Sequence, residues 1–345
     1  MMRRLKVRRY LVLLFTIFVL IKLPSGISEF RTGTMQKQSY PEYMNKRAFA
    51  QAINEPTNAL TQITPNFNEE ILQDNPHRMK RTPPDKTFND KQEIYYQNKV
   101  AVLTYHHLDP VESFVTITPD RFKSHLEALK NNGFHVISIE DFVAFLQKKK
   151  AVSPNAVVIT FDDGYESVYQ YAYPVLKSEG MTATFFLIVS YIEDGTIRTP
   201  PILNWKEIIE MHNEGFSFYS HTFNSHETVA SIKEEVSSKL TAKIFNSSVN
   251  RFENESEYKS RIRNDLIKAD DILNEKLGNK MNLLCLPHGK YNQEVIDIAK
   301  QAQISFVFTG LEGLNTDNNK LIKRFNAGSP YMSDNLLIKM LSQSK

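Results

Sequence analysis

The sequence predicts an α/β fold of the (β/α) barrel type, preceded by a segment that does not belong to the barrel. From Lys99 onward, apolar strand-like runs alternate with amphipathic helical stretches, and this region has roughly the 250 residues of such a barrel. An open doubly wound sheet is the alternative. No G-x-G-x-x-G motif follows an early strand, which weakens the dinucleotide-binding form of that alternative.

The composition indicates one large domain or two smaller ones. The chain has 345 residues, of which 41% are hydrophobic, so most of it can form a core. Its single cysteine excludes internal disulfides and multi-cysteine metal sites. The net charge of +3, from 42 basic and 39 acidic residues, is too balanced for a dedicated nucleic-acid binder. We expect a monomer.

Residues 1–28 are predicted to be a signal peptide or a signal anchor. Five basic residues precede an uncharged apolar run of 12 residues, Tyr10 to Ile21. A helix that spans a bilayer needs about 20 apolar residues, whereas such a short run is typical of an export signal. We therefore expect a secreted or cell-surface protein that meets the membrane only through this segment. Residues 29–97 are predicted to be a disordered linker, and residues 98–345 the folded domain.

The expected elements follow one another along residues 98–345. The strand candidates are Val100–Thr104, His135–Ile137, Val157–Phe161, Ala183–Ile188, Phe216–Ser220, Leu283–Leu286, Ser305–Thr309 and Leu321–Phe325. Two helices have clear start signals, Thr118 before Pro119 and Ser138 with a capping box. Further helices are expected over Glu166–Ser178, Trp205–Asn213, Glu257–Leu277, Gln293–Ala302 and Asp334–Leu341.

Polar side chains gather where these strands end. In a barrel all of these ends open onto one face, which is where active sites are built. Residues that are dispersed in the sequence would therefore converge in space. The groups are Tyr105-His106-His107, Asp162-Asp163-Gly164, His221, Pro287-His288-Gly289 and Arg324.

The strongest candidates are two carboxylates and two histidines. Asp162 and Asp163 leave a strand on opposite sides, so one can ligate a metal while the other faces the attacking water. An Asp-Gly turn without catalytic function is the alternative. His221 and His226 are five residues apart, a spacing that suits a loop around an ion better than a helix. Two histidines and one aspartate leave open positions for water and substrate.

Two further groups are expected to take part in catalysis, whereas the single cysteine is not. The turn at Pro287-His288-Gly289 can aim the backbone N–H of His288 at a developing oxyanion. His106 suits the role of a general acid, because an unperturbed imidazole has a pKa of about 6.5. His107 is the alternative candidate for this role. Cys285 is expected to be a buried strand residue rather than a nucleophile.

These motifs resemble the polysaccharide deacetylases of carbohydrate esterase family 4, over about residues 99–330. The resemblance implies the distorted TIM-like NodB-homology fold, Asp162 as catalytic base, and Asp163, His221 and His226 as metal ligands. The histidine spacing and the Tyr105-His106 pair resemble the branch that deacetylates poly-β-1,6-N-acetylglucosamine, where the upstream histidine is the general acid.

The chain also departs from the family pattern. His288 stands where Pro-Tyr-Gly is usual, so only its backbone donor carries over. The arginine that often precedes this motif is missing, and Arg324 is the candidate to orient Asp162 instead, with a surface arginine as the alternative.

The resemblance implies metal-dependent removal of N-acetyl groups from an extracellular amino-sugar polymer, with release of acetate. Poly-β-1,6-N-acetylglucosamine is the expected polymer, and peptidoglycan or chitin oligomers are the alternatives. A catalytically silent carbohydrate-binding barrel is the alternative of another class. Zinc is the expected ion, with cobalt, nickel or iron(II) as alternatives. Residues 227–257 are a candidate flap, and the candidate sugar-stacking residues are Tyr105, Tyr165, Trp205 and Phe223.

Overall fold

The structure is a computed structural model that describes residues 93–230 and 236–344. The predicted signal segment 1–28 and residues 29–92 of the predicted linker lie outside the described residues. The described residues belong to one folded unit. Its contacts begin before the expected boundary at residue 98, because the Asn155 side chain accepts hydrogen bonds from the backbone N–H groups of Tyr95 and Tyr96.

The core of the unit is a nine-stranded sheet whose strand pairs are all parallel, with the order β14-β13-β12-β7-β6-β5-β1-β15 and with β4 beside β5. Seven of the eight predicted strands are present with ends shifted by at most one residue, and the eighth, Leu321–Phe325, is present in two parts. The strands are β1 (Val100–Tyr105), β4 (His135–Val136), β5 (Ala156–Phe161), β6 (Thr184–Leu187), β7 (Ser217–Ser220), β12 (Leu283–Cys285), β13 (Phe306–Phe308), β14 (Leu321–Ile322) and β15 (Phe325–Asn326).

One short segment closes the sheet into a barrel. The predicted strand Leu321–Phe325 is split into β14, which pairs with β13, and β15, which pairs with β1. Only Lys323 and Arg324 separate these two strands, so the first and last strands of the sheet order are neighbours in the chain. The barrel prediction is therefore confirmed, and the open doubly wound sheet is wrong.

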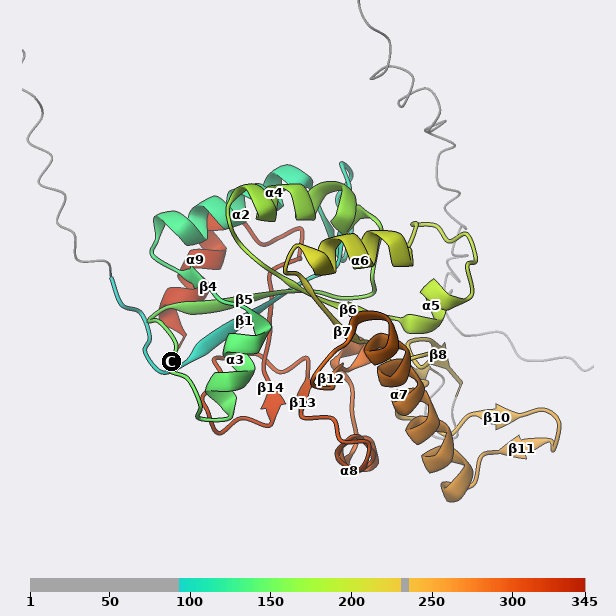
Figure 1. The fold of residues 1–345 in the computed structure, drawn as a ribbon. Coiled ribbons are helices and arrows are strands. Elements are labelled where there is room, and N and C mark those ends of the chain that lie inside the picture. Colours follow the sequence, from blue (N-terminus) through green and yellow to red (C-terminus); the bar gives the residue numbers. More distant parts are fainter. Residues whose placement is uncertain (1–92, 231–235, 345) are drawn as a thin grey trace, which may run out of the picture. The chain divides into compact units, whose positions relative to one another are not determined.

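Helices cover this sheet, and most of them were predicted. Thr118 and Ser138 cap their helices as expected, each accepting a backbone N–H bond, although Ser138 lacks the reciprocal bond of a full capping box. Figure 1 shows α2, α4 and α6 along one side of the sheet, with α8 on the other. The helices are α2 (Pro119–Asn131), α3 (Ile139–Leu146), α4 (Tyr173–Ser178), α5 (Val189–Glu193), α6 (Trp205–Asn213), α7 (Glu255–Leu277), α8 (Gln293–Gln301) and α9 (Asp334–Gln343).

Several short elements were not predicted. The first half of the expected helix Glu166–Ser178 is a π-helical stretch, Val168–Ala172, which continues into α4. The candidate flap 227–257 contains two small antiparallel pairs, and the second pair projects beyond the end of α7 (Figure 1). The short strands are β2 (His107–Leu108), β3 (Thr116–Ile117), β8 (Thr228–Val229), β9 (Ser237–Ser238), β10 (Phe245–Asn246) and β11 (Arg251–Phe252).

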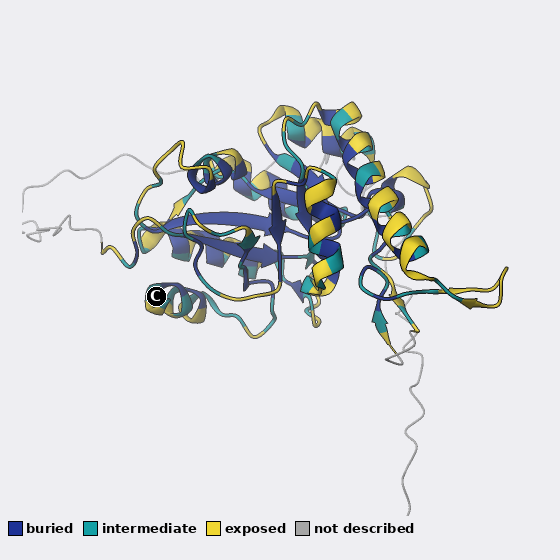
Figure 2. Cartoon of the chain, turned by 90° about the horizontal axis from the view of Figure 1, so that it is seen from below, coloured by how far each residue is buried: buried dark blue, intermediate teal, exposed yellow. Residues whose placement is uncertain are grey.

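The strands are buried on both faces, and alternate residues belong to different clusters. Val100 and Val102 of β1 pack with α3 and with inward residues of the other strands, whereas Leu103 and Tyr105 pack with the outer helices. Figure 2 shows the result, with the central strands of the sheet buried and the helices exposed along one face. This two-sided burial is typical of parallel sheets. Within the described ranges, no helix has both the length and the apolar character required to cross a bilayer.

Asp270 of α7 is a buried carboxyl, and its Oδ2 has no hydrogen-bond partner among the described residues. Burial, together with the neighbouring Asp271 charge, raises the pKa of Asp270 from 3.8 to about 7. The folded protein therefore keeps a proton that the unfolded chain releases above about pH 4. The stability contributed by this proton is lost as the pH rises from about 4 to about 7.

The substitution Asp270→Asn should remove this pH dependence, because the amide carries no charge. We expect the free energy of unfolding to rise by about 1–3 kcal/mol at pH 8 and to change by less than about 1 kcal/mol at pH 4. Urea titrations at the two pH values measure both quantities. The exposed Asp297→Asn is the matched control. An equal gain at both pH values would show that the buried charge is not the cause.

Candidate active site

The two adjacent carboxylates lie at the carboxyl end of β5. Asp162 continues the alternation that points Ala156 and Val158 to the inner cluster, and the Asp162 backbone N–H donates to the Tyr105 carbonyl at 2.9 Å. Asp163 and Gly164 have φ angles of 74° and 81°, so the chain does turn here, as the Asp-Gly pair predicted. The turn leaves both carboxylates buried, with exposures of 2% and 7%. A surface turn without function does not explain this burial.

Asp163, His221 and His226 converge on one point. The Asp163 Oδ1 atom lies 3.4 Å from His221 Nε2 and 3.1 Å from His226 Nε2, yet it is buried without a hydrogen-bond partner among the described residues. Ligand atoms about 2.0–2.2 Å from one tetrahedral zinc ion lie about 3.3–3.6 Å apart. The spacing, the unpartnered oxygen and the donor types therefore fit a divalent metal held by these three side chains.

The electrostatics of this group keep Asp163 ionised, which is the state in which a carboxylate binds a metal. Burial raises the pKa of Asp163, but the two imidazoles outweigh it and hold that pKa well below its usual range. His221 donates its Nδ1 proton to the backbone carbonyl of Cys285 at 2.9 Å, which leaves Nε2 free to act as a ligand. The remaining histidine, His226, comes from the loop that follows β7.

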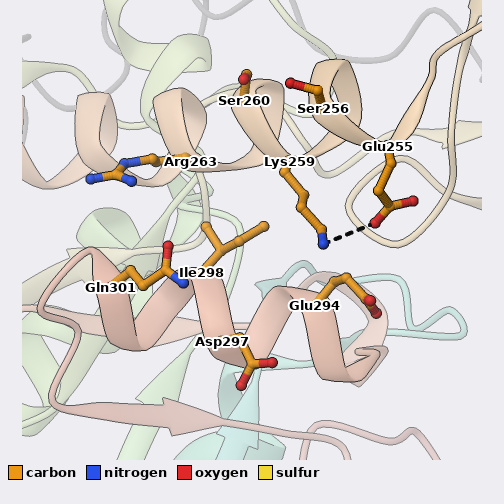
Figure 3. A pocket seen from close by; sticks show the side chains of 9 residues that line it. All are labelled: Glu255, Ser256, Lys259, Ser260, Arg263, Glu294, Asp297, Ile298 and Gln301. Atoms are coloured by element: carbon orange, nitrogen blue, oxygen red, sulfur yellow. Dashed lines mark ion pairs between the residues drawn. The ribbon is translucent and has the colours of Figure 1, made fainter.

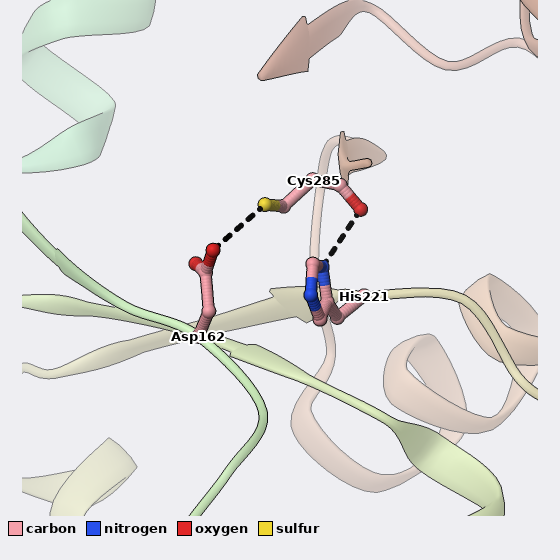
Figure 4. A group of neighbouring side chains, drawn as sticks. All are labelled: Asp162, His221 and Cys285. Carbon is pink, nitrogen blue, oxygen red and sulfur yellow. Dashed lines mark hydrogen bonds between the residues drawn. The ribbon is translucent and has the colours of Figure 1, made fainter. Parts of the chain in front are cut away.

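Asp162 is held by three neighbours from different parts of the chain. Its Oδ1 accepts a 2.8 Å bond from Arg324, and its Oδ2 lies 3.4 Å from the Cys285 thiol and 4.0 Å from His106 Nε2. Figure 4 shows the thiol contact beside His221. Burial raises the pKa of Asp162, but the Arg324 charge outweighs it, and the pKa lies below its usual value. Arg324 itself is buried, so the surface-arginine alternative is wrong.

Cys285 is buried, as expected from its place in a strand. Burial raises the pKa of its thiol, which therefore remains protonated and can donate to Asp162. No feature of its surroundings makes it a nucleophile.

The structure separates His106 from His107. His106 follows β1 on the inner side, with Nε2 near Asp162 and with a buried Nδ1 that has no partner among the described residues. His107 points elsewhere, because its Nδ1 bonds the Ser167 hydroxyl at 2.8 Å and its ring packs on Tyr165. Burial lowers the pKa of His106 from its ordinary value, although the charge of Asp162 acts to raise it.

The third motif forms a tight turn after β12. His288 has a φ of 57°, and no hydrogen bond from its backbone N–H is found in the described part of the chain. Its side chain is exposed and bonds the His226 carbonyl at 2.8 Å. Gly289 has a φ of 65°, and a Cβ there would lie 2.6 Å from the backbone of Gly310. Only glycine allows the two backbones to approach this closely.

The aromatic candidates differ in accessibility. Tyr105 is wrong as a sugar-stacking residue, because it is 0% exposed, packs on Phe122 and lies 3.2 Å from His125 Nδ1. Its alternation along β1 points it towards α2. The other three are partly buried: Tyr165 lies against His107, the Trp205 indole donates to Glu193, and Lys268 lies 3.8 Å over the Phe223 ring.

Two cavities differ in their relation to the site. A cavity of about 560 Å³ lies between α7 and α8, and the mixed charges that line it contain no site residue (Figure 3). A cavity of about 480 Å³ adjoins the loop that holds the histidines, with Phe223, Asn224 and Glu227 in its lining. Only the second cavity touches the loop of the proposed ligands.

Sequence reasoning missed Asp265, in the middle of α7. Its carboxylate accepts hydrogen bonds from the backbone N–H groups of Phe223 and Asn224 and from the Ser225 hydroxyl, at 2.8, 2.9 and 2.8 Å. These three residues lie between the two histidines. A lone acidic residue on a charged helix has no local signal for such a contact.

The buried pair of Arg324 and Asp162 leads to a stability prediction. The substitution Arg324→Met leaves Asp162 without its cation, so we expect the free energy of unfolding to fall by about 3–5 kcal/mol at pH 7. Without the arginine the pKa of Asp162 rises, and protonation then relieves the loss at low pH. Denaturant titration should show a smaller difference at pH 4. The exposed Arg263→Met is the control. A loss that is equal at both pH values would rule out this account.

Comparisons with known proteins agree with this geometry. The family profile described as "Polysaccharide deacetylase" matches residues 149–307. Over 231 residues, the chain is 27% identical to the poly-beta-1,6-N-acetyl-D-glucosamine N-deacetylase of Staphylococcus epidermidis, covering 62% of this chain and 73% of that relative.

Solved structures share the fold. The de-N-acetylase from Aggregatibacter actinomycetemcomitans matches with a TM-score of 0.65 at 25% identity, over 70% of this chain and 99% of that chain. The BpsB deacetylase domain from Bordetella bronchiseptica matches with a TM-score of 0.59 at 23% identity, over 66% and 94%. The family match over residues 149–307 and the named relatives show that this chain contains a polysaccharide deacetylase domain and is an enzyme of that kind.

Proposed function

We propose that this enzyme is a metal-dependent, extracellular N-deacetylase that acts on poly-β-1,6-N-acetylglucosamine and releases acetate. The observation that carries the proposal is the convergence of Asp163, His221 and His226 beside a separately held carboxylate, Asp162. The named relative from Staphylococcus epidermidis supports the choice of polymer. The basic and apolar N-terminal segment supports export and a surface location.

Asp162 is the proposed catalytic base. Arg324 binds Oδ1, so Oδ2, whose hydrogen-bond neighbour is the weakly donating Cys285 thiol, is the oxygen proposed to take a proton from the attacking water. When bound, the metal would polarise the acetamide carbonyl and lower the pKa of water to about 7. Zinc suits a site with two imidazoles and one carboxylate, and cobalt, nickel and iron(II) accept the same ligands.

His106 and His288 are the proposed donors to the leaving amine and to the oxyanion, respectively. A ring whose pKa is lowered by burial is mostly neutral at pH 7, so His106 must acquire a proton during the cycle. Asp162 lies 4.0 Å away and is the proposed source. His106 would then protonate the departing amine. The unbonded backbone N–H of His288 is the proposed donor to the oxyanion.

Two substitutions should distinguish the proposed metal ligands from the proposed catalytic base. Asp162→Asn keeps the shape of the side chain but cannot accept the proton, so we expect metal content to be retained and kcat to fall by about 10²–10⁴. His221→Ala removes a ligand, so we expect both metal and turnover to be lost. Elemental analysis and acetate release measure the two effects. Near-normal turnover in metal-loaded Asp162→Asn would place the base elsewhere.

His106 and His107 form a matched pair of neighbouring histidines. We expect His106→Ala to lower kcat by about 10² or more, because only this ring faces Asp162. We expect less than about a tenfold effect from His107→Ala, with metal content unchanged in both variants. Steady-state kinetics and metal analysis of the two variants measure these effects. A larger loss in His107→Ala would assign the acid to the other ring.

Acetate release from defined polymers tests the function itself. The purified protein, loaded with zinc, is incubated with poly-β-1,6-N-acetylglucosamine, chitin oligomers or peptidoglycan, with Asp162→Asn as the inactive control. Acetate release from the first polymer alone supports the proposal. Acetate release from another polymer would make that polymer the substrate in place of poly-β-1,6-N-acetylglucosamine. Binding without acetate release from any polymer would identify a silent carbohydrate-binding barrel.

A further inference from the structure

The loop between the two proposed histidine ligands is held in an uncommon conformation. Thr222, directly after His221, has a φ of 73°, and β-branched residues rarely adopt the left-handed region. Such a residue is strained and persists only where its surroundings hold it. The loop must then return His226 to the same point as His221. Its conformation therefore needs external support.

Part of this support comes from bonds that no side-chain substitution outside the loop removes. Ser225 donates its backbone N–H to the Thr222 hydroxyl at 3.1 Å. On the far side, the carbonyls of Thr222 and Phe223 accept backbone N–H bonds from Val189 and Ser190 of α5. These bonds fix the edges of the loop, but they provide no acceptors for the backbone N–H groups at its centre.

Asp265 supplies the missing acceptors. Its two carboxylate oxygens accept the consecutive N–H groups of Phe223 and Asn224 and the Ser225 hydroxyl, so one side chain binds three successive loop residues. Lys268, one turn further along α7, lies over the Phe223 ring. Both side chains therefore hold the same part of the loop from the same face of the helix.

The helix that carries Asp265 is a rigid support. Asn254 caps α7 in a reciprocal bond pattern with Glu257, and Ile262 and Leu266, on either side of Asp265, are fully buried. The position of the carboxylate is thus set by packing that is independent of the loop. Removing it would leave two backbone N–H groups unpaired beside the ligands.

We propose that Asp265 is a positioning residue that sets the metal affinity of the site by holding residues 222–226 in the ligating conformation. This inference rests on the proposed metal site formed by Asp163, His221 and His226. Asp265 touches neither the metal ligands' side chains nor the reacting atoms. Its effect passes through the backbone of the loop.

The test compares Asp265→Asn with Glu275→Gln, a carboxyl-to-amide change at an exposed position of the same helix. The amide offers fewer acceptors and points an N–H group at the loop donors. We expect the zinc dissociation constant of Asp265→Asn, measured by competition with a chromophoric chelator, to rise about 10–100-fold, the range seen for partners behind metal ligands. The control should retain parental affinity and activity.

The thermal unfolding of the metal-free proteins separates positioning from general stability. If Asp265 only stabilises the packing of α7, the metal-free variant melts earlier while the folded protein binds zinc with unchanged affinity, and this result would overturn the inference. Should Asp265→Asn fail to fold, Ser225→Ala removes only one of the three bonds. We expect that variant to bind zinc several-fold more weakly, and unchanged affinity there would equally reject the inference.

The outcome is distinguishable from that of the proposed function. Zinc affinity is measured without substrate, so it does not depend on which polymer is cleaved. A parental protein that binds zinc but releases no acetate would refute the deacetylase proposal and leave the Asp265 comparison intact. Normal zinc affinity in a folded Asp265→Asn variant of an active enzyme would refute only the role of Asp265.

Discussion

The site depends on the burial of two adjacent carboxylates at the end of β5. A buried carboxylate without partners is so unfavourable that it would take up a proton and lose its chemistry. Asp162 and Asp163 stay ionised because each faces cationic or N–H-bearing groups from distant segments: Arg324 for the first, and His221 with His226 for the second. The barrel's closing segment and the β7 loop can therefore be understood as the means of bringing those partners to β5.

Much of this arrangement could be predicted from the sequence. Polar residues placed after apolar runs fall at strand ends in a parallel sheet, and that rule alone locates Asp162, Asp163, His221 and His106. The period of two along a strand also carries information about direction. Val100 and Val102 point inward, so His106 does as well, whereas Tyr105 points to the helices. Applying this rule to Tyr105 would have prevented its assignment to the sugar surface.

The remainder depends on long-range contacts that no local pattern records. Arg324 reaches Asp162 across 162 positions of the chain, and Asp265 reaches the histidine loop across about 40. Both residues have the local context of ordinary surface charges. The split of the last predicted strand into β14 and β15 is of the same kind, since it is the closure of the barrel that assigns each half a different neighbour.

Cys285 serves the site through two separable parts of one residue. Its carbonyl fixes the tautomer of His221, and any amino acid at this position would supply that oxygen. Its thiol contacts Asp162, and that contact changes with every substitution. A substitution at position 285 would therefore change what the proposed base faces, while the main-chain oxygen that orients the proposed metal ligand stays in place. The main chain and the side chain of one residue thus serve two different members of the site.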